Sequence, residues 1–181
     1  MPLSLESFAR NYATAAHESI DQRRKFTGEP YIVHPAAVVE LVRSMPHDDA
    51  MLAAAWLHDV VEDTNLCQQH KLTRAEKIMI IGGLFGDDVG TLVGWLTDVA
   101  TPADGDRATR KALNRAHSAA APARAQTIKV ADVIDNSRTI AALDPEFARV
   151  YLPEKAALVE VLDKADSALI AMAKEHVRAY I

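Results

Sequence analysis

The sequence predicts an all-α protein built as a bundle of seven to nine helices. Apolar residues recur at helical spacing along most of the chain, helix-start and helix-stop residues separate these segments, and no stretch alternates with the period of two typical of β-strands. With 181 residues, we expect one domain spanning 1–181, in which 146–181 forms a C-terminal helical extension packed on the rest.

Composition narrows the class of protein. Hydrophobic residues make up 49% of the chain, yet no apolar run is long enough to cross a bilayer and no signal-like segment is present, so we expect a cytoplasmic protein that does not bind membranes. The net charge of −5 argues against a protein that coats nucleic acid. The one cysteine, Cys67, excludes an internal disulfide and a thiolate-rich zinc site, so any metal would be bound by histidine and carboxylate groups.

The N-terminal segment from about Ser4 to Ile20 has the apolar spacing of an amphipathic helix. His17, near its end, is expected to be a cap-region or surface histidine. A basic loop follows, Asp21–Tyr31, in which three successive cations run into a glycine and a proline. The loop could hold a phosphate or stack an arginine on a nucleobase, and the alternative is a solvated run of charge.

A short extended segment, Tyr31–Val33, is expected to precede the next helix. Pro35 disfavours helical torsions at the residue before it, which places His34 at the mouth of a helix that continues until Pro46. Asp48 or Asp49 then provides an N-cap for a helix from about Ala50 to Glu62.

This predicted helix carries an unusual decamer, Ala55–Thr64, which sets four polar groups in an apolar run. On a helix, Glu62 lies four residues after His58 and Asp63 four after Asp59, so both pairs can face one patch. Burying these groups is costly unless they are paired or bind a cation. The alternative is an exposed helix end whose charges are solvated.

Two helices are expected in the middle of the chain, one starting at the capping box Thr73–Glu76 and one at Gly86. A further helix carries a second basic cluster. Most of its cations fit an exposed face, although Arg110 and Lys111 could reach a polyphosphate.

The long apolar segment from about Ala123 to Leu143 is predicted to be one buried helix. Asp132, Asp135 and Asn136 share one of its faces, and a mid-helix Asp132 needs a partner, which could be a cation or a lysine or arginine of the bundle. A last helix from about Pro153 to Tyr180 would contact the core or a partner helix, which leaves a homodimer open.

Four of these side chains could share one ion. His34, His58, Asp59 and Asp132 offer two imidazoles and two carboxylates, which suits a divalent metal that keeps positions open for water and substrate oxygens.

The order of the motifs is that of a known family. The Arg-Lys loop, Tyr-Ile-Val-His-Pro, His-Asp-Val-Val-Glu-Asp-Thr and Ile-Lys-Val-Ala-Asp-Val-Ile-Asp-Asn-Ser-Arg-Thr together resemble the HD superfamily of metal-dependent phosphohydrolases. Within it, residues 5 to 145 are similar to the hydrolase domain of RelA/SpoT-type proteins, and more narrowly to the stand-alone small alarmone hydrolases. The resemblance implies an HD-domain helical bundle that removes the 3′-pyrophosphate of ppGpp and pppGpp, a guanosine polyphosphate nucleotide being the partner.

The resemblance also implies roles for individual residues. It makes His34, His58, Asp59 and Asp132 manganese ligands and associates the Glu-Asp pair with activation of the attacking water. The residues that it implies for nucleotide binding are Arg24 on guanine, Lys25 beside it, and Asn136 and Thr139 on the nucleoside. The Glu-Asp pair that the resemblance associates with activation of water consists of Glu62 and Asp63. The chain departs from the family pattern at Asp135, where a histidine is common, and at Phe26-Thr27, where the loop is one residue longer.

Two rival functions keep the same metal site. One is an HD-type hydrolase acting on another nucleotide, such as a deoxynucleotide monophosphate or the 2′-phosphate of NADPH. The other is a non-catalytic nucleotide sensor, which the presence of both members of the Glu-Asp pair disfavours.

Overall fold

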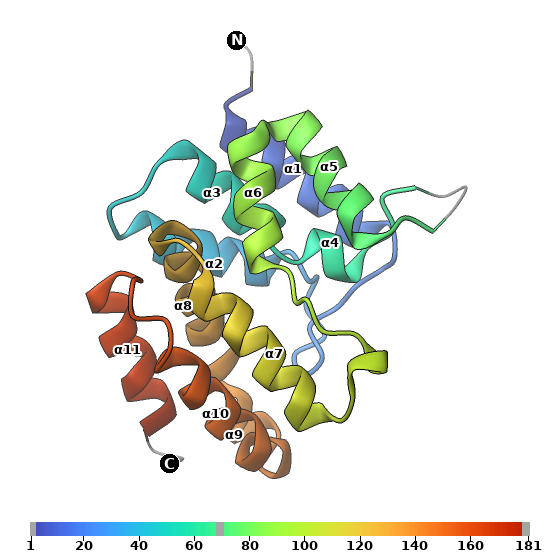
Figure 1. Ribbon diagram of the computed structural model, residues 1–181. Helices are drawn as coiled ribbons and strands as arrows, with labels where there is room; N and C mark the ends of the chain where they lie inside the picture. The colour runs from blue at the N-terminus through green and yellow to red at the C-terminus, as the bar shows by residue number, and fades with distance from the viewer. Residues whose placement is uncertain (1–2, 68–70, 179–181) are drawn as a thin grey trace. The chain divides into compact units, whose positions relative to one another are not determined.

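The structure, a computed structural model, describes residues 3–67 and 71–178. In that part of the chain it contains eleven α-helices, α4 and α9 being of four residues each, so the expected all-α class is confirmed (Figure 1). The chain divides into two compact units, Met1–Thr97 and Asp98–Ile181, which are described one at a time. Among the described residues, none of the helices has the length and apolarity needed to span a membrane.

Unit 1 is organised around one helix that is apolar on every side. Every residue of α3 from Met51 to Leu57 is buried, as expected of a helix surrounded by others. It packs against α1, α2 and α6. The helices of unit 1 are α1 (Leu5–Glu18), α2 (Val33–Arg43), α3 (Asp49–Leu57), α4 (Val60–Asp63), α5 (Arg74–Phe85) and α6 (Asp87–Leu96).

Helix caps in unit 1 lie where the sequence predicts them. The Asp48 carboxylate accepts a hydrogen bond from Met51 N at 2.9 Å and starts α3. Thr73 and Glu76 form the reciprocal capping box of α5. The segment Tyr31–Val33, expected to be extended, is instead a turn at Tyr31 and Ile32 followed by the first residue of α2, so that prediction is wrong.

The predicted helix from Ala50 to Glu62 is also wrong in one respect, because the helix ends at Leu57 and a new one begins at Val60. Asp59 has φ −96° and ψ −8°, which departs from helical torsions and makes it the N-cap of α4. The break places the two acidic residues of α4 in its first turn, where the helix dipole favours negative charge.

Unit 2 is built on α8, whose residues are mostly buried. This helix packs against α7, α9, α10 and α11. The elements of unit 2 are η1 (Pro102–Asp104), α7 (Arg107–Ala120), α8 (Ala123–Ser137), α9 (Ile140–Leu143), α10 (Pro145–Val159) and α11 (Ser167–Arg178).

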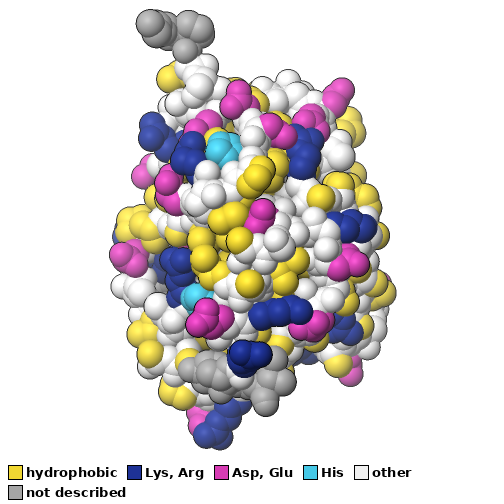
Figure 2. All heavy atoms as spheres, turned by 90° about the vertical axis from the view of Figure 1, so that its left-hand side faces the viewer, with side chains coloured by type: hydrophobic (Ala, Val, Ile, Leu, Met, Phe, Trp, Pro, Cys, Tyr) yellow, Lys and Arg dark blue, Asp and Glu magenta, His cyan; other side chains and the backbone are white. Residues whose placement is uncertain are grey.

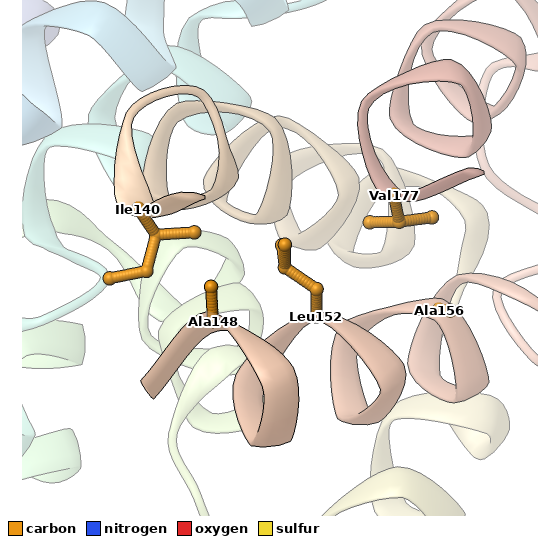
Figure 3. Packing of buried hydrophobic residues seen from close by; sticks show 5 residues of the cluster. All are labelled: Ile140, Ala148, Leu152, Ala156 and Val177. Carbon is orange, nitrogen blue, oxygen red and sulfur yellow. The ribbon is translucent and has the colours of Figure 1, made fainter. Parts of the chain in front are cut away.

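A small apolar cluster joins three helices of unit 2. Figure 3 shows Ala148 and Leu152 on one face of α10, turned toward Ile140 of α9 and Val177 of α11. These side chains are at most 4% exposed, so the cluster holds the C-terminal helices of the unit together by apolar burial.

Two long helices predicted in unit 2 are interrupted. The segment from Ala123 to Leu143 breaks after Ser137, because Thr139 has φ −118° and ψ −10° and starts the separate helix α9. The segment from Pro153 to Tyr180 is not one helix either, since Pro153 lies inside α10, which begins at Pro145.

The break between α10 and α11 has a tertiary cause. The backbone N–H of Lys164 donates to Oε1 of the fully buried Gln126 at 2.9 Å, and that of Asp166 donates to Thr127 Oγ1 at 3.1 Å. Asp166 Oδ1 in turn accepts from Ala168 N at 2.9 Å and caps α11. Side chains of α8 therefore satisfy backbone groups that a continuous helix would bond internally.

Charges of both signs are mixed on the surface. On the face seen in Figure 2, lysine and arginine side chains lie interspersed with aspartate and glutamate.

Candidate metal centre

Three predicted ligands come together in unit 1. His34 is the second residue of α2, and His58 and Asp59 occupy the gap between α3 and α4. One ligand atom from each of the three lies within 4.8 Å of the other two. His34 and His58 are 1% and 2% exposed, so both imidazoles are held in place by packing.

The hydrogen bonds of His58 fix which of its nitrogens can bind a cation. Nδ1 lies 2.7 Å from the carbonyl oxygen of Ala55, and because that oxygen only accepts, Nδ1 carries the proton. In the neutral ring, Nε2 then presents its lone pair, 3.2 Å from Nε2 of His34. Two ring nitrogens this close are stabilised when a cation lies between them, which fits a metal ligand pair.

Asp59 supplies the negative charge of the site. Its Oδ2 lies 3.1 Å from Nε2 of His58 and 3.5 Å from Nε2 of His34, and it accepts a hydrogen bond from the hydroxyl of Tyr31 at 2.6 Å. Burial opposes ionisation, but the His58 and His34 imidazoles in their protonated form outweigh it and hold the pKa of Asp59 well below its usual value; a bound cation would take over this role beside neutral rings. The donor set of two imidazoles and one ionised carboxylate therefore fits a divalent cation such as manganese or iron.

The two acidic residues of α4 lie beside this group in sequence and are both exposed. Gln22 Nε2 donates to Asp63 Oδ2 at 2.8 Å. Although Asp63 as a whole residue is exposed, the protein packed around its carboxylate raises its pKa, and repulsion from Asp59 adds to the effect. Asp63 is therefore a better proton acceptor than an ordinary surface aspartate.

A buried lysine holds the end of α4. The ammonium of Lys77, on α5, donates to the carbonyl oxygens of Val61 at 2.8 Å and Thr64 at 2.5 Å. These are carbonyls at the C-terminal end of a short helix, which otherwise lack partners. Lys77 thus anchors the helix that carries Glu62 and Asp63.

The basic loop is a tight turn closed by its own backbone. Arg24 N donates to Glu29 O at 2.9 Å, and Gly28 N donates to Arg24 O at 3.0 Å, with Gly28 at φ 71°. Arg24 is half-buried and Lys25 is exposed, its ammonium 4.7 Å from the ring centroid of Phe26. The turn presents both cations from a defined backbone.

The other predicted residues belong to unit 2. Asp132 is 5% exposed; its Oδ1 accepts from Asn136 Nδ2 at 2.5 Å, and its Oδ2 lies 3.5 Å from the ammonium of Lys129. Lys129 is therefore one cationic partner of this buried aspartate within unit 2, in keeping with the predicted pairing with a lysine of the bundle. Thr139 is exposed at the start of α9.

Sequence reasoning missed three residues around the centre: Tyr31 on Asp59, Gln22 on Asp63, and His17. His17 was expected to be a cap-region or surface histidine; it lies in the last turn of α1 and is 1% exposed, so the surface alternative is wrong. Its ring centroid lies 4.8 Å from that of Tyr31. Residues of this kind have no local signature, because their partners lie 28 and 41 positions along the chain.

Most of the chain is similar to known proteins. The family model described as HD domain matches residues 9–159. A protein of Synechocystis sp. named probable guanosine-3′,5′-bis(diphosphate) 3′-pyrophosphohydrolase is 37% identical over 137 residues, which cover 74% of this chain and 17% of that protein. The Vibrio cholerae guanosine-3′,5′-bis(diphosphate) 3′-pyrophosphohydrolase is 32% identical over 150 residues, covering 80% of this chain and 19% of that protein.

The chain spans about a fifth of the length of these curated relatives. A solved structure described as a metazoan ortholog of SpoT that hydrolyses ppGpp aligns more fully. It matches with a TM-score of 0.81 and 29% identity, over 99% of this chain and 97% of the other.

Proposed function

This chain belongs to the HD-domain family, and we propose that it is a cytoplasmic, metal-dependent hydrolase of guanosine polyphosphates. The reaction is removal of the 3′-pyrophosphate of ppGpp or pppGpp, which gives GDP or GTP and pyrophosphate. The observation that carries the proposal is the convergence of the His34 and His58 imidazoles with the Asp59 carboxylate within 4.8 Å. The names of the relatives and of the matching structure support the choice of substrate.

We assign His34, His58, Asp59 and Asp132 as the residues that hold the metal, with manganese as the preferred ion. When bound, a divalent ion polarises a phosphoryl oxygen and lowers the pKa of water. Two of the ligands are neutral imidazoles and two are carboxylates, a set that suits manganese better than a soft ion.

The residues of the chain carry out the remaining steps. Glu62 or Asp63 accepts a proton from water, whose oxygen attacks the phosphorus attached to the ribose 3′ oxygen. The bond between that phosphorus and the 3′ oxygen breaks, and the 3′ oxygen takes up a proton as pyrophosphate leaves. The pKa of Asp63 is raised toward neutral pH, which makes its carboxylate a stronger base and favours it as the proton acceptor.

We assign nucleotide binding to the basic loop and to two residues of unit 2. The Arg24 guanidinium can stack on the guanine ring and Lys25 can pair with a phosphate. Asn136 and Thr139 supply amide and hydroxyl groups for the nucleoside.

The test is release of pyrophosphate from ppGpp by the purified chain with manganese, compared with a chelator-treated sample. Combining Glu62→Gln with Asp63→Asn removes both candidate proton acceptors and should lower kcat by about a hundredfold or more. Glu175→Gln is the matched control, because Glu175 is also exposed and lies on α11, and should leave kcat unchanged.

The same assay separates the rivals. Release of orthophosphate from NADPH or a deoxynucleotide monophosphate, without turnover of ppGpp, would identify a different HD hydrolase. Metal binding and ppGpp binding without turnover of any nucleotide would identify a sensor.

A further inference from the structure

A hydrogen-bonded chain runs from the end of α1 to α4 in unit 1. His17 Nδ1 lies 2.6 Å from Gln22 Oε1, and Gln22 Nε2 donates to Asp63 Oδ2 at 2.8 Å. The three residues come from three segments, and the second bond joins positions 41 residues apart. Neither His17 nor Gln22 belongs to the metal ligands or to the groups assigned to the nucleotide.

The chemistry of the three groups allows one direction for this chain. The Asp63 carboxylate accepts, so Gln22 must turn its NH₂ toward it, and the Gln22 carbonyl oxygen then faces His17. Because that oxygen also only accepts, Nδ1 of His17 must carry a proton. The orientation of the glutamine amide is therefore set from both ends.

His17 is suited to hold such an orientation. It is 1% exposed, and its ring lies 4.8 Å from the Tyr31 ring. Among the residues that the structure describes, its Nε2 has no hydrogen-bond partner, so within them the bond to Gln22 is the one polar contact of the ring. Burial lowers the pKa of His17, which keeps the imidazole neutral and its Nδ1–H tautomer defined at neutral pH. Because packing holds the buried His17 ring in place, its hydrogen bond fixes the orientation of the Gln22 amide better than a bond from an exposed side chain would.

We propose that His17 and Gln22 are positioning residues that orient the Asp63 carboxylate for acceptance of the water proton. The Gln22 NH₂ group donates a hydrogen bond to Oδ2 of Asp63, so that Oδ1 is the oxygen that accepts the proton. This inference rests on the proposed function, in which Glu62 or Asp63 receives the proton.

The first experiment replaces Gln22 with methionine, which keeps the length of the side chain and removes the amide. Measured with ppGpp and manganese, Gln22→Met should lower kcat by about tenfold to a hundredfold while KM and bound manganese stay near the wild-type values. Loss of bound manganese, or a rise in KM with unchanged kcat, would overturn the positioning role.

The second experiment uses a matched pair at His17. The amide nitrogen of asparagine can take the place of Nδ1, whereas that of glutamine takes the place of Nε2, so His17→Asn keeps the donor to Gln22 and His17→Gln moves it away. We expect His17→Asn to retain most of the kcat and His17→Gln to lose about as much as Gln22→Met. Equal losses in the two variants would overturn the proposal, and this pair decides the question even if Gln22→Met does not fold.

A readout independent of turnover separates this inference from the proposed function. In crystal structures of the full chain, Gln22→Met and His17→Gln should show the Asp63 carboxylate rotated from its wild-type position, and His17→Asn should not. An unmoved Asp63 in Gln22→Met would refute the inference even if ppGpp is the substrate. Absence of ppGpp hydrolysis by the wild type would instead refute the proposed function, and the structures would still show whether Gln22 orients Asp63.

Discussion

Replacing Gly90 with alanine should lower the free energy of unfolding, because α5 and α6 cross at this glycine. A Cβ at Gly90 would lie 2.7 Å from Gly82 Cα, 3.1 Å from Gly82 N and 3.5 Å from Ile78 O. All three are backbone atoms, so a side chain cannot rotate away to relieve the contact and the two helices must separate. Overpacking of this kind costs about 1–3 kcal/mol.

The same substitution removes a glycine from a helix, which by itself stabilises the fold by about 1 kcal/mol. Taking the upper part of the overpacking range, since backbone opposes backbone, the net loss for Gly90→Ala is about 1–2 kcal/mol. Gly83, also on α5, is the matched control because a Cβ there meets nothing within 4 Å. Gly83→Ala should stabilise the protein by about 0.5–1 kcal/mol.

Urea unfolding followed by circular dichroism measures both changes. The two variants should differ in free energy of unfolding by about 2 kcal/mol, with Gly90→Ala the less stable. If Gly90→Ala proves as stable as Gly83→Ala, the close approach of α5 and α6 is not present in solution and the reasoning fails.

Three further predictions concern the anchors and the metal. Lys77→Met leaves the Val61 and Thr64 carbonyls without their ammonium partner and should cost about 1–3 kcal/mol of unfolding free energy in urea titrations, and an unchanged midpoint would contradict this. Glu6 accepts from Arg43 at 2.5 Å, and although burial opposes ionisation, Arg43 and a second donor, the Trp56 indole, lower its pKa below 4.5. At pH 7, Glu6→Gln should therefore lower the free energy of unfolding by about 1–2 kcal/mol. The stability that ionised Glu6 provides is present above pH 4.5 and is lost as the pH falls through the lowered pKa of Glu6 in the folded protein. Thermal melts of both proteins at a series of pH values will check this. Finally, adding manganese to chelator-treated protein should raise the melting temperature, because an ion that binds the folded state stabilises it, and a melting temperature independent of manganese would argue against the centre.

The sequence by itself determined the class of fold and several helix starts. The Thr73–Glu76 capping box and the Asp48 cap each depend on residues three positions apart, so they can be recognised locally. Pro35 likewise marks the first turn of a helix, which put His34 near a helix start, although His34 is itself helical and not held outside the helix by Pro35.

The candidate ligand residues were also predictable by type. His58 and Asp59 stand out as polar groups within an apolar helical segment, and burying them without a partner is costly. Their short distance from His34 is set by the tertiary structure, because it depends on the packing of α2 against α3.

Only the tertiary structure decided where the helices break and which residues support the site. Periodicity predicts a continuous helix through His58 and Asp59, and another through 160–166, and both are interrupted. At 160–166 the groups that bond the freed backbone lie far away in sequence. Gln126 accepts a hydrogen bond from the backbone N–H of Lys164, 38 positions away. Tyr31 donates to Asp59, 28 positions away, and Gln22 donates to Asp63, 41 positions away. Local sequence sets the preference of a segment, whereas hydrogen bonds between distant segments form only after the chain has packed.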